Sequence, residues 1–235
     1  ARAKIDYSNG SGTAQAVLAG SSGVPFSMGI NARLQPKLWL VAVSGKANGI
    51  GFRTPRAAQI EPLDGEYRLL PSQVDFDKGS ARIAGTYGKG LSLQARLDKL
   101  DLSVANALFP NLGIDGSATG SVDYVQAAGA DVPNIDTRLT ITNFTRSSAV
   151  IVSEPVDIQV VGRLTEAGGD MRALVKRGVT TVGRLQARLA PLGGGASWMD
   201  RLYAAPLSGG IRYNGPSGVL FSLSGLSGQQ VAGGV

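Results

Sequence analysis

The side chains that most enzymes use for proton transfer and nucleophilic attack are missing from this chain. It contains no histidine and no cysteine. Zinc sites built on these residues, thiol nucleophiles and histidine-based triads are therefore excluded. A nucleophilic serine would need a lysine base, but the chain has no Gly-x-Ser-x-Gly motif and few lysines.

Carboxylates are the remaining candidates for acid–base chemistry or calcium binding. Three pairs close in sequence are Asp75 with Asp77, Asp98 with Asp101, and Asp64 with Glu66. None belongs to a loop with the ligand spacing of a calcium site. Asp75 and Asp77 alternate with apolar residues, which is typical of the polar face of a strand. We therefore expect no catalytic residue, no metal site and no cofactor, and we do not expect an enzyme.

The chain is basic, with a net charge of +6 and 16 Arg against 7 Lys. Its cations are scattered along the sequence and are not accompanied by an aromatic-rich motif, so we expect no nucleic-acid partner. Arginine recurs about once per predicted strand, which indicates a solvated outer surface that also discourages edge pairing, with contact to lipid headgroups as the alternative. These arginines are Arg82, Arg96, Arg138, Arg163, Arg184, Arg188 and Arg212.

Apolar and polar residues alternate along much of the chain, which predicts half-buried β-strands. The pattern is cleanest from Leu91 to Asp98 and recurs in residues 135–142, 156–164 and 183–189. Pairs of Asn-Gly or Asp-Gly, which favour tight turns, predict strand boundaries. They occur at 9–10, 48–49, 64–65, 115–116 and 214–215. The sequence therefore predicts an all-β fold of successive antiparallel hairpins.

Two short helices interrupt this pattern, and an internal repeat links them. Caps at Asp101 and at Ser197 predict helices over residues 101–109 and 197–204. Leu-Gln-Ala-Arg-Leu occurs at 93–97 and again at 185–189, each time before one of these helices. A glycine-rich strand ending on Tyr124 or Tyr213 follows each helix. We therefore expect two related strand–helix–strand units, with Leu93 and Leu185 on the same side of the sheet.

The apolar face of the predicted strands is too large for two short helices to cover. A second sheet, a bilayer or an apolar ligand inside a curled sheet could cover it. A membrane barrel is disfavoured because aromatic residues are only 6% of the chain and two helices interrupt the strands. A long meander curled into an open groove and a β-sandwich both remain. The residues predicted to line this face are Leu91, Leu93, Ala95, Leu97, Leu139, Ile141, Ile158, Val160, Leu185, Ala187, Leu189, Ile211, Phe221 and Leu223.

The order of these elements resembles the repeats of TamB-like translocation and assembly module proteins, which belong to the AsmA-like superfamily. The resemblance rests on a short helix with Leu-Phe-Pro followed by Gly-Ser-Ala-Thr-Gly-Ser-Val-Asp-Tyr at 116–124. It rests also on Ala-Pro-Leu-Ser-Gly-Gly-Ile-Arg-Tyr at 205–213, which runs into the apolar stretch 218–225. Residues 90–235 carry the likeness, whereas residues 1–90 share only the general style of a β-meander.

The resemblance implies a β-taco-like groove that carries or shields phospholipid acyl chains between the inner and outer membranes and supports outer-membrane protein assembly. It also implies the periplasm of a Gram-negative envelope, an inner-membrane anchor elsewhere in a longer protein, and a barrel partner such as TamA. Because the chain starts directly on a strand, without Met, we expect an internal fragment. Within it we expect one continuous sheet made of a meander (1–90), a first unit (91–182) and a second unit (183–235). The alternative is a structural or chaperone-like β-protein that pairs with outer-membrane strands and transports no lipid.

Overall fold

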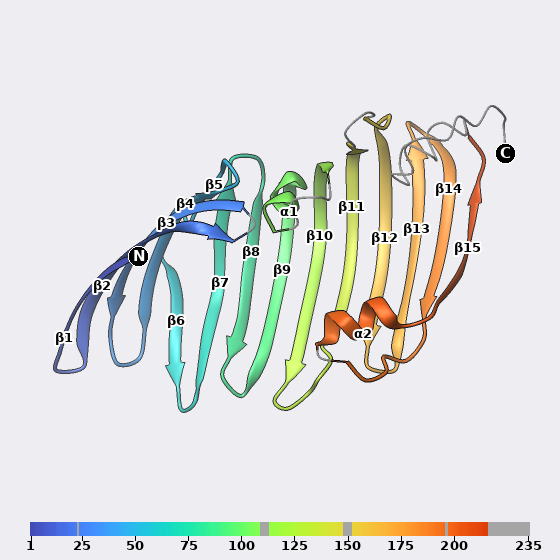
Figure 1. Cartoon of the computed structure of the whole chain (residues 1–235). Coiled ribbons are helices and arrows are strands. Elements are labelled where there is room, and N and C mark those ends of the chain that lie inside the picture. The colour runs from blue at the N-terminus through green and yellow to red at the C-terminus, as the bar shows by residue number, and fades with distance from the viewer. Residues whose placement is uncertain (23, 109–112, 148–151, 196, 216–235) are drawn as a thin grey trace.

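The computed structural model describes residues 1–22, 24–108, 113–147, 152–195 and 197–215, and these form one antiparallel sheet of 15 strands with two short helices (Figure 1). The strands are β1 (Arg2–Ser8), β2 (Ser11–Ser22), β3 (Val24–Leu34), β4 (Trp39–Ala47), β5 (Ile50–Arg53), β6 (Ala58–Leu63), β7 (Glu66–Phe76), β8 (Ser80–Tyr87), β9 (Gly90–Asp101), β10 (Ile114–Ala127), β11 (Asn134–Arg146), β12 (Val156–Thr165), β13 (Gly168–Arg177), β14 (Thr180–Leu189) and β15 (Leu207–Tyr213). The helices are α1 (Ser103–Leu108) and α2 (Trp198–Ala204).

Almost every strand pairs with its neighbours in sequence, so the sheet is a meander from β1 to β15. The strands β5 and β6 are the exception, because both pair with β4 and with β7 and together fill one place in the order. The edges β1 and β15 lie at opposite ends of the sheet and do not pair with each other (Figure 1). The predicted all-β meander with two short helices is therefore confirmed, and the sheet is not a closed barrel.

Turn chemistry explains most of the hairpins. Asn9-Gly10 and Asn48-Gly49 both have φ values of 50° and 81°, the left-handed conformation that a two-residue hairpin turn requires. The prediction of a turn at Asp115-Gly116 is wrong. These two residues lie inside β10, where the pairing with β11 shifts register at a β-bulge. Gly116 has a φ of 130° in this bulge, a backbone conformation that glycine tolerates, as it does in a tight turn.

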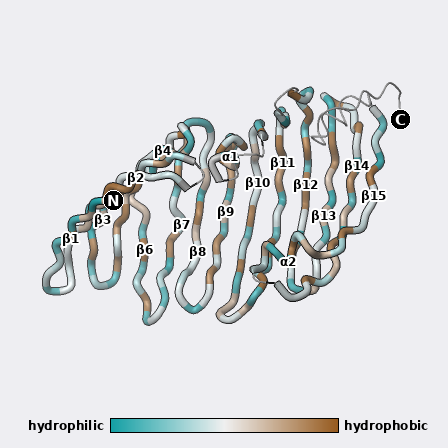
Figure 2. The backbone as a smooth tube through the Cα atoms, viewed as in Figure 1, coloured by the Kyte–Doolittle hydropathy of each residue, from teal (hydrophilic) through white to brown (hydrophobic). Residues whose placement is uncertain are grey.

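The sheet is a single layer, and few side chains are fully buried. Figure 2 shows hydrophobic and hydrophilic segments alternating along the strands, as expected when one side of a sheet differs from the other. Within the described ranges no second sheet packs against the first, which excludes the β-sandwich for this part of the chain. In the described part of the chain, the apolar side chains that are nearly or fully buried are Ala81, Ala118, Val132, Pro133, Val156, Val182 and Leu192.

Helix α1 is tied to the strands on both sides of it. The Asp101 carboxylate at the end of β9 accepts a hydrogen bond from the Ser103 backbone N–H at 2.9 Å, so it caps the helix as expected. The Asn106 side chain donates to the Ile114 carbonyl at 2.8 Å and accepts from the Ile114 N–H at 3.2 Å. These three bonds fix the crossing from β9 to β10.

We expect the stability contributed by Asp101 to depend on pH. Burial raises the pKa of Asp101, but hydrogen bonds from Ser103 and the nearby Lys78 ammonium outweigh burial and lower the pKa below its usual value. The charged form therefore stabilises the fold, and this contribution is lost as pH falls through the lowered pKa. Asp101→Asn keeps an oxygen that can cap the helix but removes the charge beside Lys78, so it should cost at most about 1 kcal/mol at neutral pH, and the difference from wild type should vanish in strong acid. Urea unfolding of both proteins at the two pH values checks this. An equal difference at both pH values would contradict it.

Helix α2 lies across the lower ends of β11 to β13 in Figure 1. The Ser197 hydroxyl caps it by accepting from the Asp200 N–H at 3.2 Å, which confirms the expected cap. Arg201 anchors it from below, because its guanidinium contacts the Asp131 carboxylate at 3.0 Å in the turn between β10 and β11. The helix is thereby held over one side of the sheet.

The two repeats occupy related places. Cross-strand pairing connects Leu93 with Leu189, which lies four residues after Leu185 in the same strand. Leu93 and Leu185 therefore lie on the same face of the sheet, as the repeat predicts. Each following strand carries glycine four residues before tyrosine, namely Gly120 before Tyr124 and Gly209 before Tyr213, and both glycines have positive φ. The strands β9 and β14 are five places apart in an antiparallel sheet, so they run in opposite directions. One unit is therefore turned end to end relative to the other, and α1 and α2 lie near opposite ends of the strands (Figure 1).

Candidate functional site

The register of the sheet brings its apolar residues onto one face. Residues directly opposite each other in neighbouring strands point to the same side. One such row crosses the sheet from β1 to β15 without a charged residue. Its members are Tyr7, Gly12, Leu34, Trp39, Ile60, Leu69, Gly85, Leu93, Tyr124, Ile135, Leu164, Gly169, Leu189 and Leu207. We call the side that carries this row the apolar face.

A second uncharged row lies on the same face, nearer the middle of the strands. It consists of Val74, Ala81, Leu97, Gly120, Leu139, Val160, Ala173, Leu185 and Ile211. The first row spans 14 strand positions, which is roughly 60 Å at a strand spacing of about 4.8 Å. The apolar face is therefore a long continuous strip rather than an isolated patch.

All the predicted lining residues that the structure describes lie on the apolar face. They are Leu91, Leu93, Ala95, Leu97, Leu139, Ile141, Ile158, Val160, Leu185, Ala187, Leu189 and Ile211. Phe221 and Leu223 lie outside the described residues. Most of these side chains are half-buried, whereas Leu91, Leu93 and Ile211 are 40%, 39% and 65% exposed. A packed core would bury them all, so this surface is partly open to solvent.

The lining residues predicted from the sequence begin at Leu91, but the apolar face also extends over β1 to β8. Phe26, Met28 and Ile30 in β3 belong to it, since they pair through β4 with the strands that follow. Trp39 in β4 and Tyr67 in β7 add an aromatic contact, with ring centroids 5.1 Å apart. The alternation of apolar and polar residues in 26–34 is the signal that would have identified this half of the surface.

A pocket of about 350 Å³ lies on the apolar face beneath α2. Leu202 of the helix covers it, and residues of β11 to β15, Leu207 among them, form its floor. Val160, Ala187 and Leu189 from the predicted set line it. Helix α2 therefore roofs a short part of the apolar face and leaves the rest without a second layer in the described ranges.

Three of the six carboxylates considered for chemistry have structural partners, namely Asp75, Asp77 and Asp101. Asp77 accepts a hydrogen bond from the Gly51 N–H at 2.7 Å, and Asp75 accepts one from the Gln73 side-chain amide at 2.7 Å. Asp101 caps α1. Across the described residues, no three Asp or Glu side chains come together as they would around a metal ion. The described helices include none that is long and apolar enough to cross a membrane.

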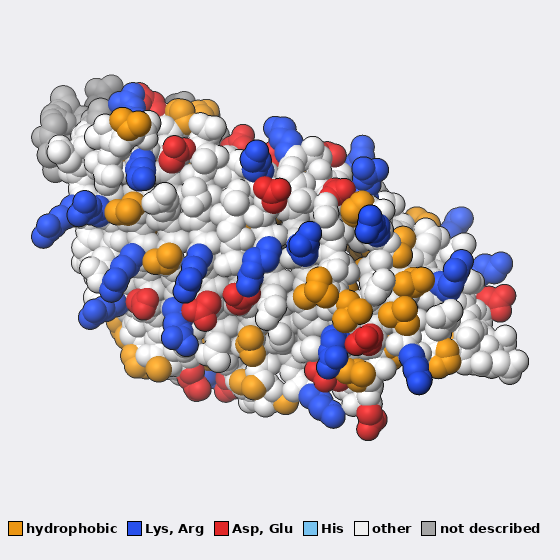
Figure 3. All heavy atoms as spheres, turned by 180° about the vertical axis from the view of Figure 1, so that it is seen from behind, with side chains coloured by type: hydrophobic (Ala, Val, Ile, Leu, Met, Phe, Trp, Pro, Cys, Tyr) orange, Lys and Arg blue, Asp and Glu red, His pale blue; other side chains and the backbone are white. Residues whose placement is uncertain are grey.

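The opposite side of the sheet, which we call the polar face, carries the charges. Seen from behind, it shows a line of Lys and Arg side chains across its middle (Figure 3). All seven arginines predicted to lie on an outer surface pair across the strands with polar-face residues; Arg82, for example, lies opposite Arg96. Several polar-face cations have carboxylate partners, such as Arg96 with Asp123 at 2.7 Å and Arg163 with Asp136 at 3.7 Å.

The arrangement can hold long aliphatic groups on one face while the other face meets water. It offers no paired acid and base for bond cleavage among the described residues. Comparison of the chain with protein-family models, with curated proteins and with solved structures finds no match.

Proposed function

We propose that this chain is a segment of an envelope-spanning protein, and that its apolar face carries or shields phospholipid acyl chains between the inner and outer membranes. The observation that supports this most is the uncharged cross-strand row from Tyr7 to Leu207, which is continuous and only partly covered. The periplasmic setting, the support of outer-membrane protein assembly and a barrel partner such as TamA follow from the resemblance to TamB-like proteins and belong to the same proposal.

The chemistry of the face suits acyl chains. Removing one CH₂ group from water is worth roughly 0.8 kcal/mol, so an acyl chain gains from any aliphatic surface of sufficient length. Leucine, glycine and isoleucine are the commonest residues of the two rows, followed by valine and alanine, and their side chains offer no polar contact that would hold a chain at one point. Many weak and similar contacts allow a bound chain to slide along the strip.

A second candidate function is strand pairing with outer-membrane proteins. The outer edges of β1 and β15 have no strand beside them in the described part of the chain. An open edge offers backbone N–H and C=O groups to an added strand. This candidate needs no lipid, so recovery of lipid separates the two functions.

Lipid extraction tests the proposal directly. The chain is purified without detergent from a Gram-negative host, extracted with organic solvent, and its phospholipid is counted per protein by mass spectrometry. We expect phospholipid to remain with the folded protein through gel filtration. Protein that is folded and free of phospholipid, and that also fails to take up a fluorescent fatty acid, would contradict the proposal.

A further inference from the structure

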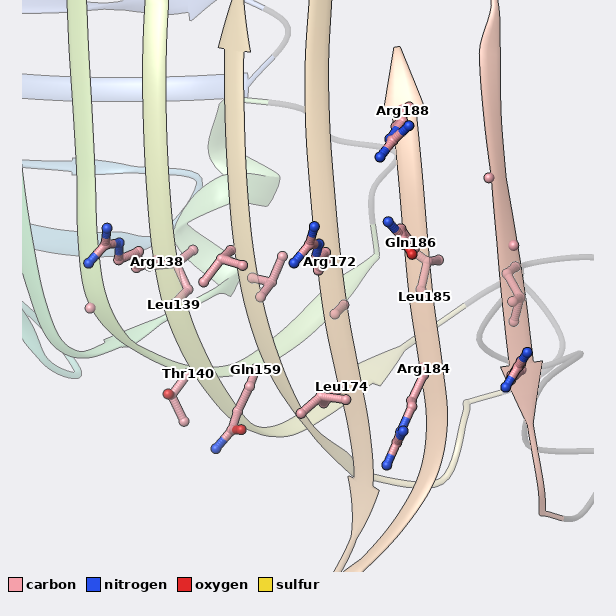
Figure 4. Close-up of a pocket in the computed structure, with 18 of the residues that line it drawn as sticks. Arg138, Leu139, Thr140, Gln159, Arg172, Leu174, Arg184, Leu185, Gln186 and Arg188 are labelled. Carbon is pink, nitrogen blue, oxygen red and sulfur yellow. The ribbon is translucent and has the colours of Figure 1, made fainter.

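A large hollow lies on the polar face, on the side of the sheet away from α2. Its volume is about 1290 Å³, and residues of β10 to β15 line it (Figure 4). Two polar-face rows form its floor. One row is Arg138, Val161, Arg172, Gln186 and Gly210, and the other is Thr140, Gln159, Leu174, Arg184 and Arg212. Figure 4 shows Arg138, Arg172 and Gln186 at one level of the strands and Thr140, Gln159, Leu174 and Arg184 at the next.

No carboxylate among the described residues pairs with the positive charges of the hollow. Five arginines line it, and they are Arg138, Arg172, Arg184, Arg188 and Arg212. None of the five forms an ion pair with a carboxylate of the described residues. Arginines elsewhere do form such pairs, as Arg68 does with Glu61 and Arg177 with Glu154. Among the residues that the structure describes, no Asp or Glu lines the hollow.

Solvation of an outer surface does not by itself require arginine rather than lysine. Lysine would solvate a surface as well as arginine, yet every cation of the hollow is arginine. Protection of an open edge does not account for this grouping, because Arg138, Arg172 and Arg184 lie on the interior strands β11, β13 and β14. Arginine differs from lysine in its planar fork of donors, which matches two oxygens of a phosphate at once.

We propose that this hollow binds a soluble ligand that carries two or more phosphate groups. The number of groups follows from spacing. Arg138 in β11 and Arg212 in β15 stand four strands apart, roughly 19 Å at about 4.8 Å per strand, so one phosphate is too small to contact all five guanidinium groups. The hydroxyl and amide groups of Thr140, Gln159 and Gln186 add neutral donors between the guanidinium groups.

The size and shape of the hollow favour a ligand over a membrane surface. Sites for small ligands have volumes of about 300–1,000 Å³, so this one has room for several phosphate groups. A flat bilayer would meet the rim of a recess rather than its floor. The inference does not depend on the proposed function, because the arginine side chains belong to the polar face, although Leu139, Val160, Ala173, Leu185 and Ile211 of the apolar-face row also contribute to the lining of the hollow.

The test uses sodium tripolyphosphate as the probe and titrates it into the whole chain by isothermal calorimetry at low salt. We expect tripolyphosphate to bind at least tenfold more tightly than orthophosphate. The double variant Arg138→Gln/Arg172→Gln should weaken binding at least tenfold. The matched control, Arg33→Gln/Arg53→Gln, removes the same charge from the polar face outside the hollow, and it should change binding less than twofold. Unchanged urea midpoints establish that both variants fold.

Three results would overturn the inference. The first is that tripolyphosphate does not bind. The second is that the two double variants weaken tripolyphosphate binding equally, which would indicate attraction to net charge alone. The third result is that the hollow variant loses binding to vesicles of phosphatidylglycerol, relative to phosphatidylcholine, while tripolyphosphate binding is unaffected, which would assign the arginines to a membrane surface. Arg172→Lys keeps the charge and removes the fork, so binding weakened by this variant supports recognition of phosphate oxygens.

Discussion

Leu189→Arg and Leu97→Arg should each lower the affinity for phospholipid by about 30-fold, so that less phospholipid is recovered with the protein. The chain should still fold cooperatively. Each leucine belongs to one of the two uncharged rows of the apolar face. A guanidinium there removes contact with two or three CH₂ groups, roughly 2 kcal/mol, and presents a charge to the acyl chain. Because the sheet is a single layer, an arginine at position 97 reaches water directly, and one at position 189 can extend past the edge of the short helix α2, so neither is trapped in a core. Lipid extraction and thermal melting of each variant measure the two effects.

Val125→Arg is the control for this experiment. Val125 is 46% exposed and lies on the polar face of β10, opposite Ser92 and Asn134. The variant adds the same charge to the same sheet without touching the apolar face, so its lipid content should equal that of wild type. Equal loss of lipid in all three variants, or unfolding of both leucine variants, would contradict transport along an open apolar face.

Gly120→Ala should lower the free energy of unfolding by about 3 kcal/mol or more. Gly120 has a φ of 143°, and its missing Cβ lets the backbone of β10 approach the Arg138 carbonyl oxygen of β11. A Cβ at this position would overlap that oxygen, so either the strand separates or the pairing shifts. Gly120 also belongs to the middle row of the apolar face, opposite Leu97 and Leu139. Urea unfolding measures the change.

Gly162→Ala is the matched control, because Gly162 lies on the apolar face two strands away in β12. A Cβ there would meet its nearest atom, the Asp170 carbonyl oxygen, at 3.6 Å, which is ordinary van der Waals contact. We expect a change within about 1 kcal/mol, and in the stabilising direction if the unfolded chain loses freedom. Similar destabilisation by both substitutions would show that the close approach at Gly120 is not the cause.

The amino-acid sequence determined the strands and their inward positions. Alternation with a period of two is a local property, since successive side chains of a strand point to opposite sides whatever the strand packs against. Leu91, Leu93, Leu185 and Leu189 could therefore be assigned to one side of their strands before any pairing was known. The caps at Asp101 and Ser197 could also be predicted from the sequence, because a capping side chain bonds to a backbone N–H only two or three residues away.

Tertiary structure alone decided whether the strands share one face, what covers it, and where the charges gather. Asp115-Gly116 forms a bulge because of the register between β10 and β11, which depends on residues far apart in the sequence and not on the dipeptide itself. A sandwich and a single layer have the same alternation, so only the strand order separates them. Arg138 and Arg212 are 74 positions apart in the sequence, and only the register of β11 to β15 brings them into one hollow. The spacing of residues along the sequence does not predict such proximity, because the pairing of the strands determines which side chains of different strands lie next to each other.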